Sequence, residues 1–122
     1  MTYLPYKRAD RVAGLLQEEI SRIIFEEIKD PRVGRVTITH VRVTDDLRLA
    51  RVYFNVLGGA ERASQCLVGL NRAKGFIRSQ IRVHTDLRYI PELEFYYDDS
   101  LDYSERIEEL IREIHKDEAS EE

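Results

Sequence analysis

Cysteine, tryptophan and long hydrophobic runs are scarce or absent in this 122-residue chain. Its one cysteine, Cys66, has no second thiol for a disulfide framework and excludes a zinc site built from several thiolates. No apolar run approaches the roughly 20 residues that a membrane-spanning helix requires, and the first residues lack the apolar stretch of a secretory signal. We therefore expect a cytoplasmic protein in a reducing compartment, with no membrane partner.

Charge is distributed unevenly along the chain. The whole chain carries 19 Lys and Arg against 23 Asp and Glu, a net charge of −4, and such acidity ordinarily argues against nucleic-acid binding. Residues 1–97, however, hold 16 basic against 12 acidic residues, whereas residues 98–122 hold 3 against 11. The acid-free stretch 62–85 contains Arg62, Arg72, Lys74, Arg78 and Arg82. The acidity thus belongs to the last fifth, and we expect a basic surface on the rest.

The first half of the chain shows helical and then strand periodicity. Apolar residues recur every three or four positions over 10–29, which predicts a helix that Asp30-Pro31 ends. Alternating apolar and polar residues predict two strands, over 36–43 and 50–56, each with one apolar and one solvated face. The alternation changes phase near His40, which predicts a β-bulge or a twist there.

The second half continues with helices and a third strand. Apolar spacing predicts a helix from Ala63 that Gly75 interrupts by a kink or short turn, and a third helix to about Val83. A third strand opens at Pro91, and a capping box formed by Asp102 and Glu105 predicts a last helix. The apolar face of that helix consists of Tyr103, Ile107, Leu110, Ile111 and Ile114. We expect one α+β domain over 1–115 and an acidic, disordered tail over 116–122.

Candidate catalytic and metal-binding residues form no convergent group. The histidines His40, His84 and His115 lack cysteine or carboxylate partners at metal-ligand spacing. Cys66 shares a helical face with apolar residues, which favours a small buried hydrophobe over a nucleophile. The chain contains no phosphate-binding loop and no dinucleotide fingerprint. We therefore expect neither an enzyme nor a bound metal or cofactor.

The basic segment around Gly75 is the strongest candidate site. Lys74, Arg78 and Arg82 are spaced four apart, so their side chains line one stripe of a helix. Gly75 lets a ligand approach the backbone closely, and a helix beginning just behind it offers free N–H groups to phosphate oxygens. The alternative is an exposed helix face kept soluble by its charges, but such faces usually mix signs. The pattern favours a nucleic-acid interface without choosing between RNA and DNA.

The order and spacing of these motifs resemble the ribosome-binding factor A family. Helix, strand, strand, helix, helix, strand is the order of a type-II KH domain, whose RNA-binding turn between paired helices is usually GxxG. Ala73-Lys74-Gly75 matches the AxG variant that marks this family. The similarity covers roughly residues 6–114 and includes Asp30-Pro31-Arg32-Val33, Val36-Thr37-Ile38-Thr39-His40-Val41, Asp46-Leu47, Ala50-Arg51-Val52-Tyr53, Arg88-Tyr89-Ile90-Pro91-Glu92-Leu93-Glu94-Phe95 and Asp98-Asp99-Ser100.

The resemblance implies a type-II KH-like fold with an added C-terminal helix and a role in ribosome biogenesis. Members of the family are non-enzymatic bacterial assembly factors that bind free 30S subunits late in maturation and support processing of 16S rRNA, near its 5′-terminal helix. They are linked to cold adaptation, and GTPases assist their release. By this resemblance we expect a monomer whose partners are the 30S subunit, 16S rRNA and assembly GTPases. Because Ala73 replaces the first glycine of the turn, shape and phosphate contact are expected in place of four-nucleotide readout.

The expected RNA-binding residues form two basic clusters, one around Gly75 and one at the N-terminus. They are Arg72, Ala73, Lys74, Gly75, Arg78, Arg82, Arg88, Lys7, Arg8 and Arg11. We expect the two clusters to lie on one surface. One alternative is a protein-interaction module of the same α+β fold without direct RNA contact, which recruits a partner through outward-pointing Tyr53 and Tyr96 or through the last helix. Another is a non-specific DNA-binding protein.

Overall fold

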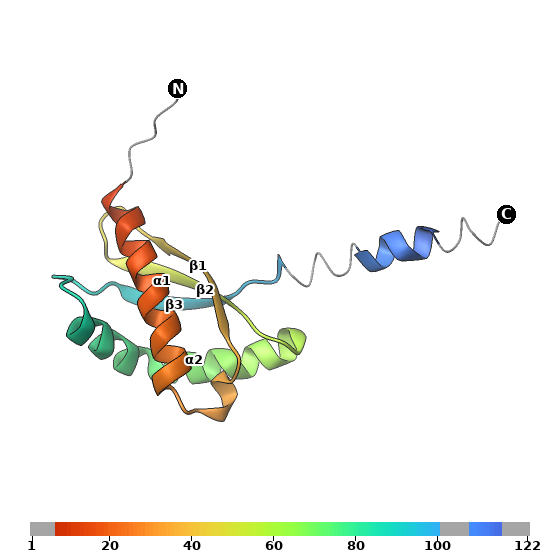
Figure 1. The fold of residues 1–122 in the computed structure, drawn as a ribbon, viewed down its shortest axis with the longest axis horizontal. Coiled ribbons are helices and arrows are strands. Elements are labelled where there is room, and N and C mark those ends of the chain that lie inside the picture. The colour runs from red at the N-terminus through yellow and green to blue at the C-terminus, as the bar shows by residue number, and fades with distance from the viewer. Residues whose placement is uncertain (1–6, 101–107, 116–122) are drawn as a thin grey trace, which may run out of the picture.

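The computed structural model describes residues 7–100 and 108–115. Two long helices and a three-stranded sheet follow the order α1 (Arg8–Glu27), β1 (Thr37–Val43), β2 (Leu49–Asn55), α2 (Gly59–His84) and β3 (Glu92–Tyr97), as Figure 1 shows. One turn of 3-10 helix, Pro31–Val33, follows α1, and its N-cap Asp30 accepts a hydrogen bond from the backbone N–H of Arg32. The first helix and the three strands agree with the predicted positions to within a few residues.

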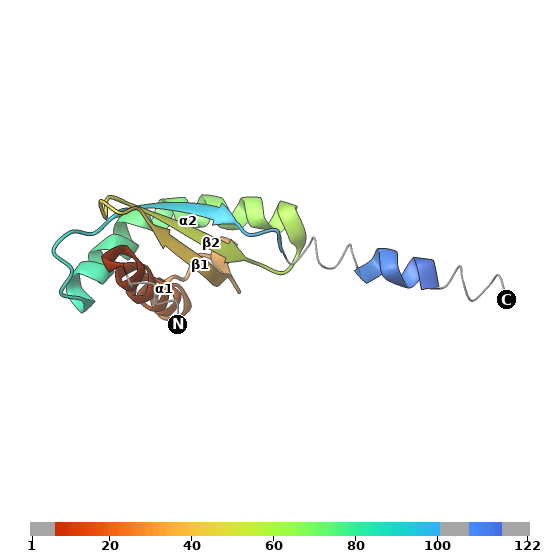
Figure 2. The ribbon, with the colours of Figure 1, turned by 90° about the horizontal axis from the view of Figure 1, so that it is seen from above.

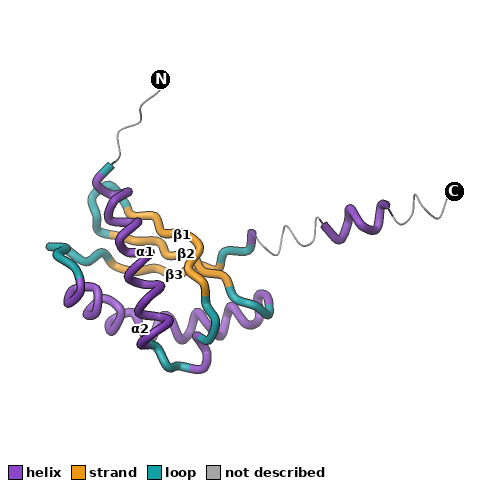
Figure 3. The backbone as a smooth tube through the Cα atoms, in the orientation of Figure 1, coloured by secondary structure: helices purple, strands orange, loops and turns teal. Residues whose placement is uncertain are grey.

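The sheet has the order β1-β2-β3, so that β2 is central (Figure 3). β1 and β2 are antiparallel, and β2 and β3 are parallel because α2 supplies the long crossover that parallel strands require. The register of β1 against β2 shifts between Ile38 and His40, the irregularity that was predicted as a bulge or twist near His40. The bulge lets Ile38 and Val41, three positions apart, both face the core.

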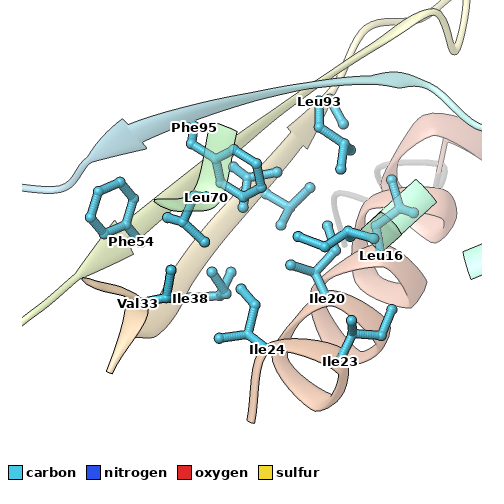
Figure 4. Close-up of a cluster of buried hydrophobic side chains, with 14 of the residues drawn as sticks. Leu16, Ile20, Ile23, Ile24, Val33, Ile38, Phe54, Leu70, Leu93 and Phe95 are labelled. Carbon is cyan, nitrogen blue, oxygen red and sulfur yellow. The ribbon is translucent and has the colours of Figure 1, made fainter. Parts of the chain in front are cut away.

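The hydrophobic core lies between the two helices and one face of the sheet. Alternate residues of β2 and β3 are buried there, namely Ala50, Val52, Phe54, Leu93 and Phe95. α1 contributes Leu16, Ile20 and Ile23, which are completely buried, and α2 contributes Leu70 (Figure 4). The other face of the sheet holds no buried residue, as the predicted alternation requires.

α2 is one continuous helix of 26 residues, so the short turn at Gly75 and the separate third helix are wrong, whereas a kink, the other predicted alternative, is compatible with an unbroken helix. Its apolar face is formed by Ala63, Cys66, Leu70, Ile77 and Ile81. The span from the first to the last of these residues is about five turns of 3.6 residues, so one unbroken helix keeps all of them against the core. Figure 2 shows that the helix axis nevertheless bends toward its C-terminal end.

Residues 108–115 are helical and stand away from the rest of the protein (Figures 1 and 2). Every side chain of this segment is exposed, including Leu110, Ile111 and Ile114. Other features predicted for this region lie outside the described residues: Asp102, Tyr103, Glu105, Ile107 and the acidic tail 116–122. None of the described helices combines the length and apolar character that crossing a bilayer needs.

Candidate nucleic-acid interface

Two of the five Lys and Arg side chains between residues 62 and 85 donate hydrogen bonds to backbone carbonyls of the protein. Arg78 donates from Nε to the carbonyl of Pro91 at 3.1 Å and from Nη2 to the carbonyl of Ile90 at 2.8 Å, and its Nη1 lies 3.5 Å from the Glu92 carboxylate. Arg62 donates to the carbonyl of Pro31 at 3.1 Å. Arg78 therefore ties α2 to the segment that enters β3, and its guanidinium is already occupied.

The three remaining cations, Arg72, Lys74 and Arg82, are what we call the α2 basic face. Arg72 and Arg82 lie on the same side of the helix as Gly75, whereas Lys74, two positions after Arg72, projects from the flank. Within the described part of the chain, no hydrogen bond or ion pair engages any of them. Arg72 and Arg82 are exposed, and Lys74 is half-buried. Since residues 62–85 include no acid, the helix itself does not neutralise these charges. The α2 basic face can thus bind an anion, and at its Arg72 end it shares a groove with the carboxylates of Glu27 and Asp30.

Gly75 lies on the exposed side of α2 between these cations. A Cβ at this position would have nothing within 4 Å, and Gly75 does not have a positive φ. A Cβ at Gly69, by contrast, would lie 2.5 Å from Cγ2 of Val33. Packing therefore requires a glycine at position 69 but not at position 75. Glycine at position 75 is also unfavourable for the helix, because it costs about 1 kcal/mol relative to alanine. Close approach of an external ligand is a reason for glycine at position 75.

Ala73 and the backbone around Gly75 differ from what the predicted turn implied. Ala73 is half-buried and packs against the core. Because α2 is continuous, Gly75 is inside a helix, and the free N–H groups expected just behind it do not exist. Contact with phosphates at this site would come from side chains rather than from a helix N-terminus.

Arg8 of the N-terminal cluster and Arg72 of α2 border different grooves. Arg8 lines a groove together with Arg48 and Tyr89, the residue that follows Arg88 in the sequence. Nζ of Lys7 lies 4.0 Å from the Asp45 carboxylate. α1 has 20 residues and is therefore about 30 Å long at 1.5 Å per residue. Arg8 and Arg72 thus do not share one groove, whereas Arg78 contacts Ile90 and Glu92, which line the groove of Arg8.

Arg72 borders a second groove, at the opposite end of α1 from Arg8. The wall of this groove includes Lys29, an exposed cation that sequence reasoning missed. No local signal pairs Lys29 with Arg72, because only the packing of α1 beside α2 brings them to one groove. Asn71 and Ser79, four positions before and after Gly75, are also exposed. Their i±4 spacing would have placed them beside Gly75 if the helix had been predicted to continue.

Asp30 faces α2 next to Gly69, and its charge is compensated by Arg32. Nη2 of Arg32 donates to Oδ2 of Asp30 at 2.6 Å, and the Arg32 backbone N–H donates to Oδ1 at 2.9 Å. The side-chain bonds and then the backbone bond hold the pKa of the Asp30 carboxyl at about 2, and the charge of Arg72 contributes in the same direction. Asp30 is therefore ionised at neutral pH but paired within its own segment.

The outer face of the sheet carries a row of aromatic rings, one from each strand. The rings of His40 and Tyr53 have centroids 6.0 Å apart, and those of Tyr53 and Tyr96 are stacked at 5.5 Å. Tyr53 and Tyr96 are thus on the solvated face, as the alternation predicted, with Tyr96 exposed and Tyr53 half-buried. Arg42 and Arg51 lie in the adjacent row of this face.

The residues weighed for catalysis do not assemble into a reactive group. Cys66 is completely buried, as predicted, and burial raises the pKa of its thiol, which suppresses the nucleophilic thiolate. Over residues 7–100 and 108–115, no group of three or more His, Cys, Asp and Glu side chains could hold a metal ion.

Comparison with known proteins identifies the family of this chain. The family model described as ribosome-binding factor A matches residues 8–111. A protein of Syntrophobacter fumaroxidans named ribosome-binding factor A is 49% identical over 117 residues, which cover 94% of this chain and 100% of that relative. A relative of the same name from Geobacter metallireducens is 45% identical over 113 residues, covering 93% of this chain and 96% of that relative.

Solved structures of this family share the fold. The solution structure of a Thermotoga maritima protein described as a putative ribosome binding factor A is 32% identical, with a TM-score of 0.69 over 81% of this chain and 94% of that chain. A Thermus thermophilus ribosome binding factor A homology model, fitted into a cryo-EM map of a 30S–RbfA complex, is 28% identical, with a TM-score of 0.53 over 70% of this chain and 93% of that chain. The α+β fold described above is the KH-like fold of these structures. The chain therefore belongs to the ribosome-binding factor A family.

Proposed function

We propose that this protein is a non-enzymatic ribosome biogenesis factor that binds the free 30S subunit and assists late maturation of its 16S rRNA, near the 5′-terminal helix of that RNA. Support comes from its relatives, which are named ribosome-binding factor A, and from the related structure fitted into a 30S–RbfA map. In this role the protein acts as a cytoplasmic monomer that binds and leaves, with GTPases assisting release and with a contribution to growth in the cold.

The observation that carries this function is the α2 basic face around Gly75. Three cations that make no hydrogen bond or ion pair within the described residues lie on α2 near Gly75, a helix position that has no side chain and open space above it. A phosphodiester chain fits this arrangement because its backbone can lie close to Gly75 while Arg72, Lys74 and Arg82 displace counterions from its phosphates. Binding through α2 is then sensitive to RNA shape rather than to base identity.

The N-terminal cations extend this interface in a second place. Arg8 and Arg11 are exposed at the beginning of α1, and Arg88 is exposed in the segment that leads to β3. Because α1 is about 30 Å long, a structured RNA that meets Arg8 and Arg72 together must span that distance. Two separated contacts favour recognition of a folded RNA over recognition of a short single strand.

The interface is tested by removing charge from α2 and, as a control, from the other side of the protein. Arg72→Gln/Arg82→Gln is expected to weaken binding to purified free small subunits by about tenfold at low salt. The slope of log affinity against log salt should become shallower by about 1.5, since each phosphate contact contributes about 0.7–0.9. The control Arg42→Gln/Arg51→Gln removes the same charge from the outer sheet face. Equal effects of the two double variants would contradict placement of the interface on α2.

A second candidate function is a protein-interaction module, which the aromatic row of His40, Tyr53 and Tyr96 supports. In the first function the protein binds its partner through RNA, and in the second it binds a protein directly through the sheet. Pull-downs with the intact protein, before and after ribonuclease digestion, distinguish them: an RNA-dependent association is lost on digestion, whereas a protein contact through the sheet survives and is lost in Tyr96→Ala.

A further inference from the structure

A largely apolar groove of about 530 Å³ lies at one end of the sheet. Its walls include Phe25 near the end of α1, Val36 just before β1, and Val56 and Leu57 just after β2. Phe25 is 90% exposed and Leu57 is 72% exposed. Two large apolar side chains so open to water, beside a concave apolar wall, are typical of a surface that another element covers.

The helical segment 108–115 has an apolar face that no residue of the described part of the chain covers. Leu110, Ile111 and Ile114 are exposed, and their spacing of one and then three positions places them on one side of a helix. A helical segment this short has little stability in water on its own, because most helix stability in proteins comes from packing of an apolar face. The segment therefore requires a surface against which to pack.

The chain leaves β3 at the rim of this groove. The backbone N–H of Asp98 donates to the carbonyl of Phe54 at 2.7 Å, and the Asp98 carboxylate accepts a hydrogen bond from Oγ1 of Thr39 at 2.7 Å. Thr39 itself lines the groove. Residues 99–107 connect this point to the helix, and nine residues span at most about 30 Å. A connection this short gives the helix an effective concentration at the groove in the millimolar range.

Charge also favours the chain's own C-terminal helix as the occupant. The charged residue in the groove wall is Arg35, and no hydrogen bond or ion pair engages it within the described residues. Glu113 precedes Ile114, so it borders the apolar face of the helix, and residues 98–122 carry 11 acids against 3 bases. Seating the helix in the groove brings acidic side chains toward Arg35.

We propose that helix 108–115 docks into this groove of the same chain through Leu110, Ile111 and Ile114. The docked helix covers Phe25 and Leu57 and places Glu113 near Arg35. The structure shows the undocked arrangement, so the protein exchanges between an extended and a closed form. This inference is independent of RNA binding, because none of the residues of the α2 basic face lines the groove.

The absence of tryptophan from the chain allows a direct test. Phe25→Trp in the full chain places a single tryptophan in the groove, and docking shifts its emission to shorter wavelength and protects it from acrylamide quenching. Adding Ile111→Asp/Ile114→Asp to the same chain should reverse both effects. Tyr89→Trp, at a position that is 72% exposed and borders a different groove, is the matched control and should show no response to the two aspartates. Leu57→Trp is a second reporter in the same groove and should respond in the same way if docking, rather than the Phe25→Trp substitution itself, causes the shift.

The fluorescence results distinguish docking of helix 108–115 within one chain from the other ways in which the groove could be covered. A blue-shifted, protected emission that is independent of protein concentration and lost with the aspartates supports docking within one chain. A shift that grows with concentration means that a second copy covers the groove. A shift that occurs only after small subunits are added means that an external partner does so, and identical spectra with and without the aspartates mean that helix 108–115 does not reach it. Any of these last three results overturns the proposal.

Discussion

Replacement of Gly75 by alanine is expected to stabilise the protein while weakening its binding to RNA. The two effects have opposite signs because they come from different causes. Inside the protein, the new methyl group meets open space, since no atom other than those of its chain neighbours and the adjacent helix backbone lies within 4 Å of its position. On the outside, the methyl group occupies the surface at which we place the RNA backbone.

The magnitude of the stability gain follows from helix propensity. Glycine in the interior of a helix costs about 0.5–1 kcal/mol relative to alanine, mostly through backbone entropy. Gly75→Ala should therefore raise the unfolding free energy by about 0.5–1 kcal/mol and the melting temperature by roughly 2–4 °C. A methyl group forced into a closely packed contact costs about 1–3 kcal/mol, which corresponds to roughly 5- to 150-fold weaker binding.

The assay pairs urea denaturation with binding to purified free small subunits. Gly14→Ala is the matched control, because Gly14 is an exposed glycine inside α1 with nothing within 4 Å of a Cβ. This control should gain similar stability with unchanged affinity. If Gly75→Ala retains wild-type affinity, or if both variants lose affinity equally, the placement of RNA against Gly75 is wrong.

Three further predictions concern the residues that hold the fold around this interface. Gly69→Ala should lower the unfolding free energy by about 1–3 kcal/mol, because its Cβ would lie 2.5 Å from Val33; an unchanged urea midpoint would contradict this packing. Arg78→Ala leaves two backbone carbonyls without their donor and should cost about 1–3 kcal/mol, whereas Arg82→Ala should cost less than about 0.5 kcal/mol, and equal losses in urea melts would refute the division between engaged and free cations. The carboxyl of Asp30 has a pKa of about 2, below its usual 3.8, so its stabilising contribution is present above about pH 4 and is lost toward pH 2. The stability difference between wild type and Asp30→Asn should shrink over that interval, and a difference that is constant with pH would count against the role of the Asp30 ion pair.

The strands and the bulge could be predicted from the sequence because their signals are local. In β2 and β3 the buried and solvated residues alternate strictly, and the change of phase near His40 is visible in the sequence of β1 alone. Since one face of the sheet must be buried, the alternation determines the register.

The continuity of α2 could not be predicted from local propensity, because the core overrides it. Gly75 costs about 1 kcal/mol in a helix. Completely burying Ile77 and Ile81 on the same face as Leu70, however, stabilises the folded state by about 1.5–3 kcal/mol for each side chain. Because burial of these side chains outweighs the cost of the glycine, the helix continues unbroken through Gly75.

Composition predicted which helix carries the candidate site, but it did not predict which of its cations are engaged within the protein or where they lie. The lack of acids over 62–85 identified the basic helix, yet it could not show that Arg78 is engaged by the carbonyls of Ile90 and Pro91, which lie more than ten residues further along the chain. Position along the chain likewise could not show that Arg8 and Arg72 lie near opposite ends of α1. Both facts depend on tertiary packing, which spacing along the sequence does not encode.

Gradient sedimentation with ribosomal particles shows whether the protein binds the free small subunit through α2. The protein is mixed with free small subunits and with complete ribosomes, and its position in each gradient is measured. Binding of the free subunit through the α2 basic face predicts that wild-type protein migrates with free small subunits and not with complete ribosomes, and that Arg72→Gln/Arg82→Gln remains near the top of the gradient. Equal migration with both particles, or migration of the double variant with free subunits as complete as that of wild type, would contradict this account.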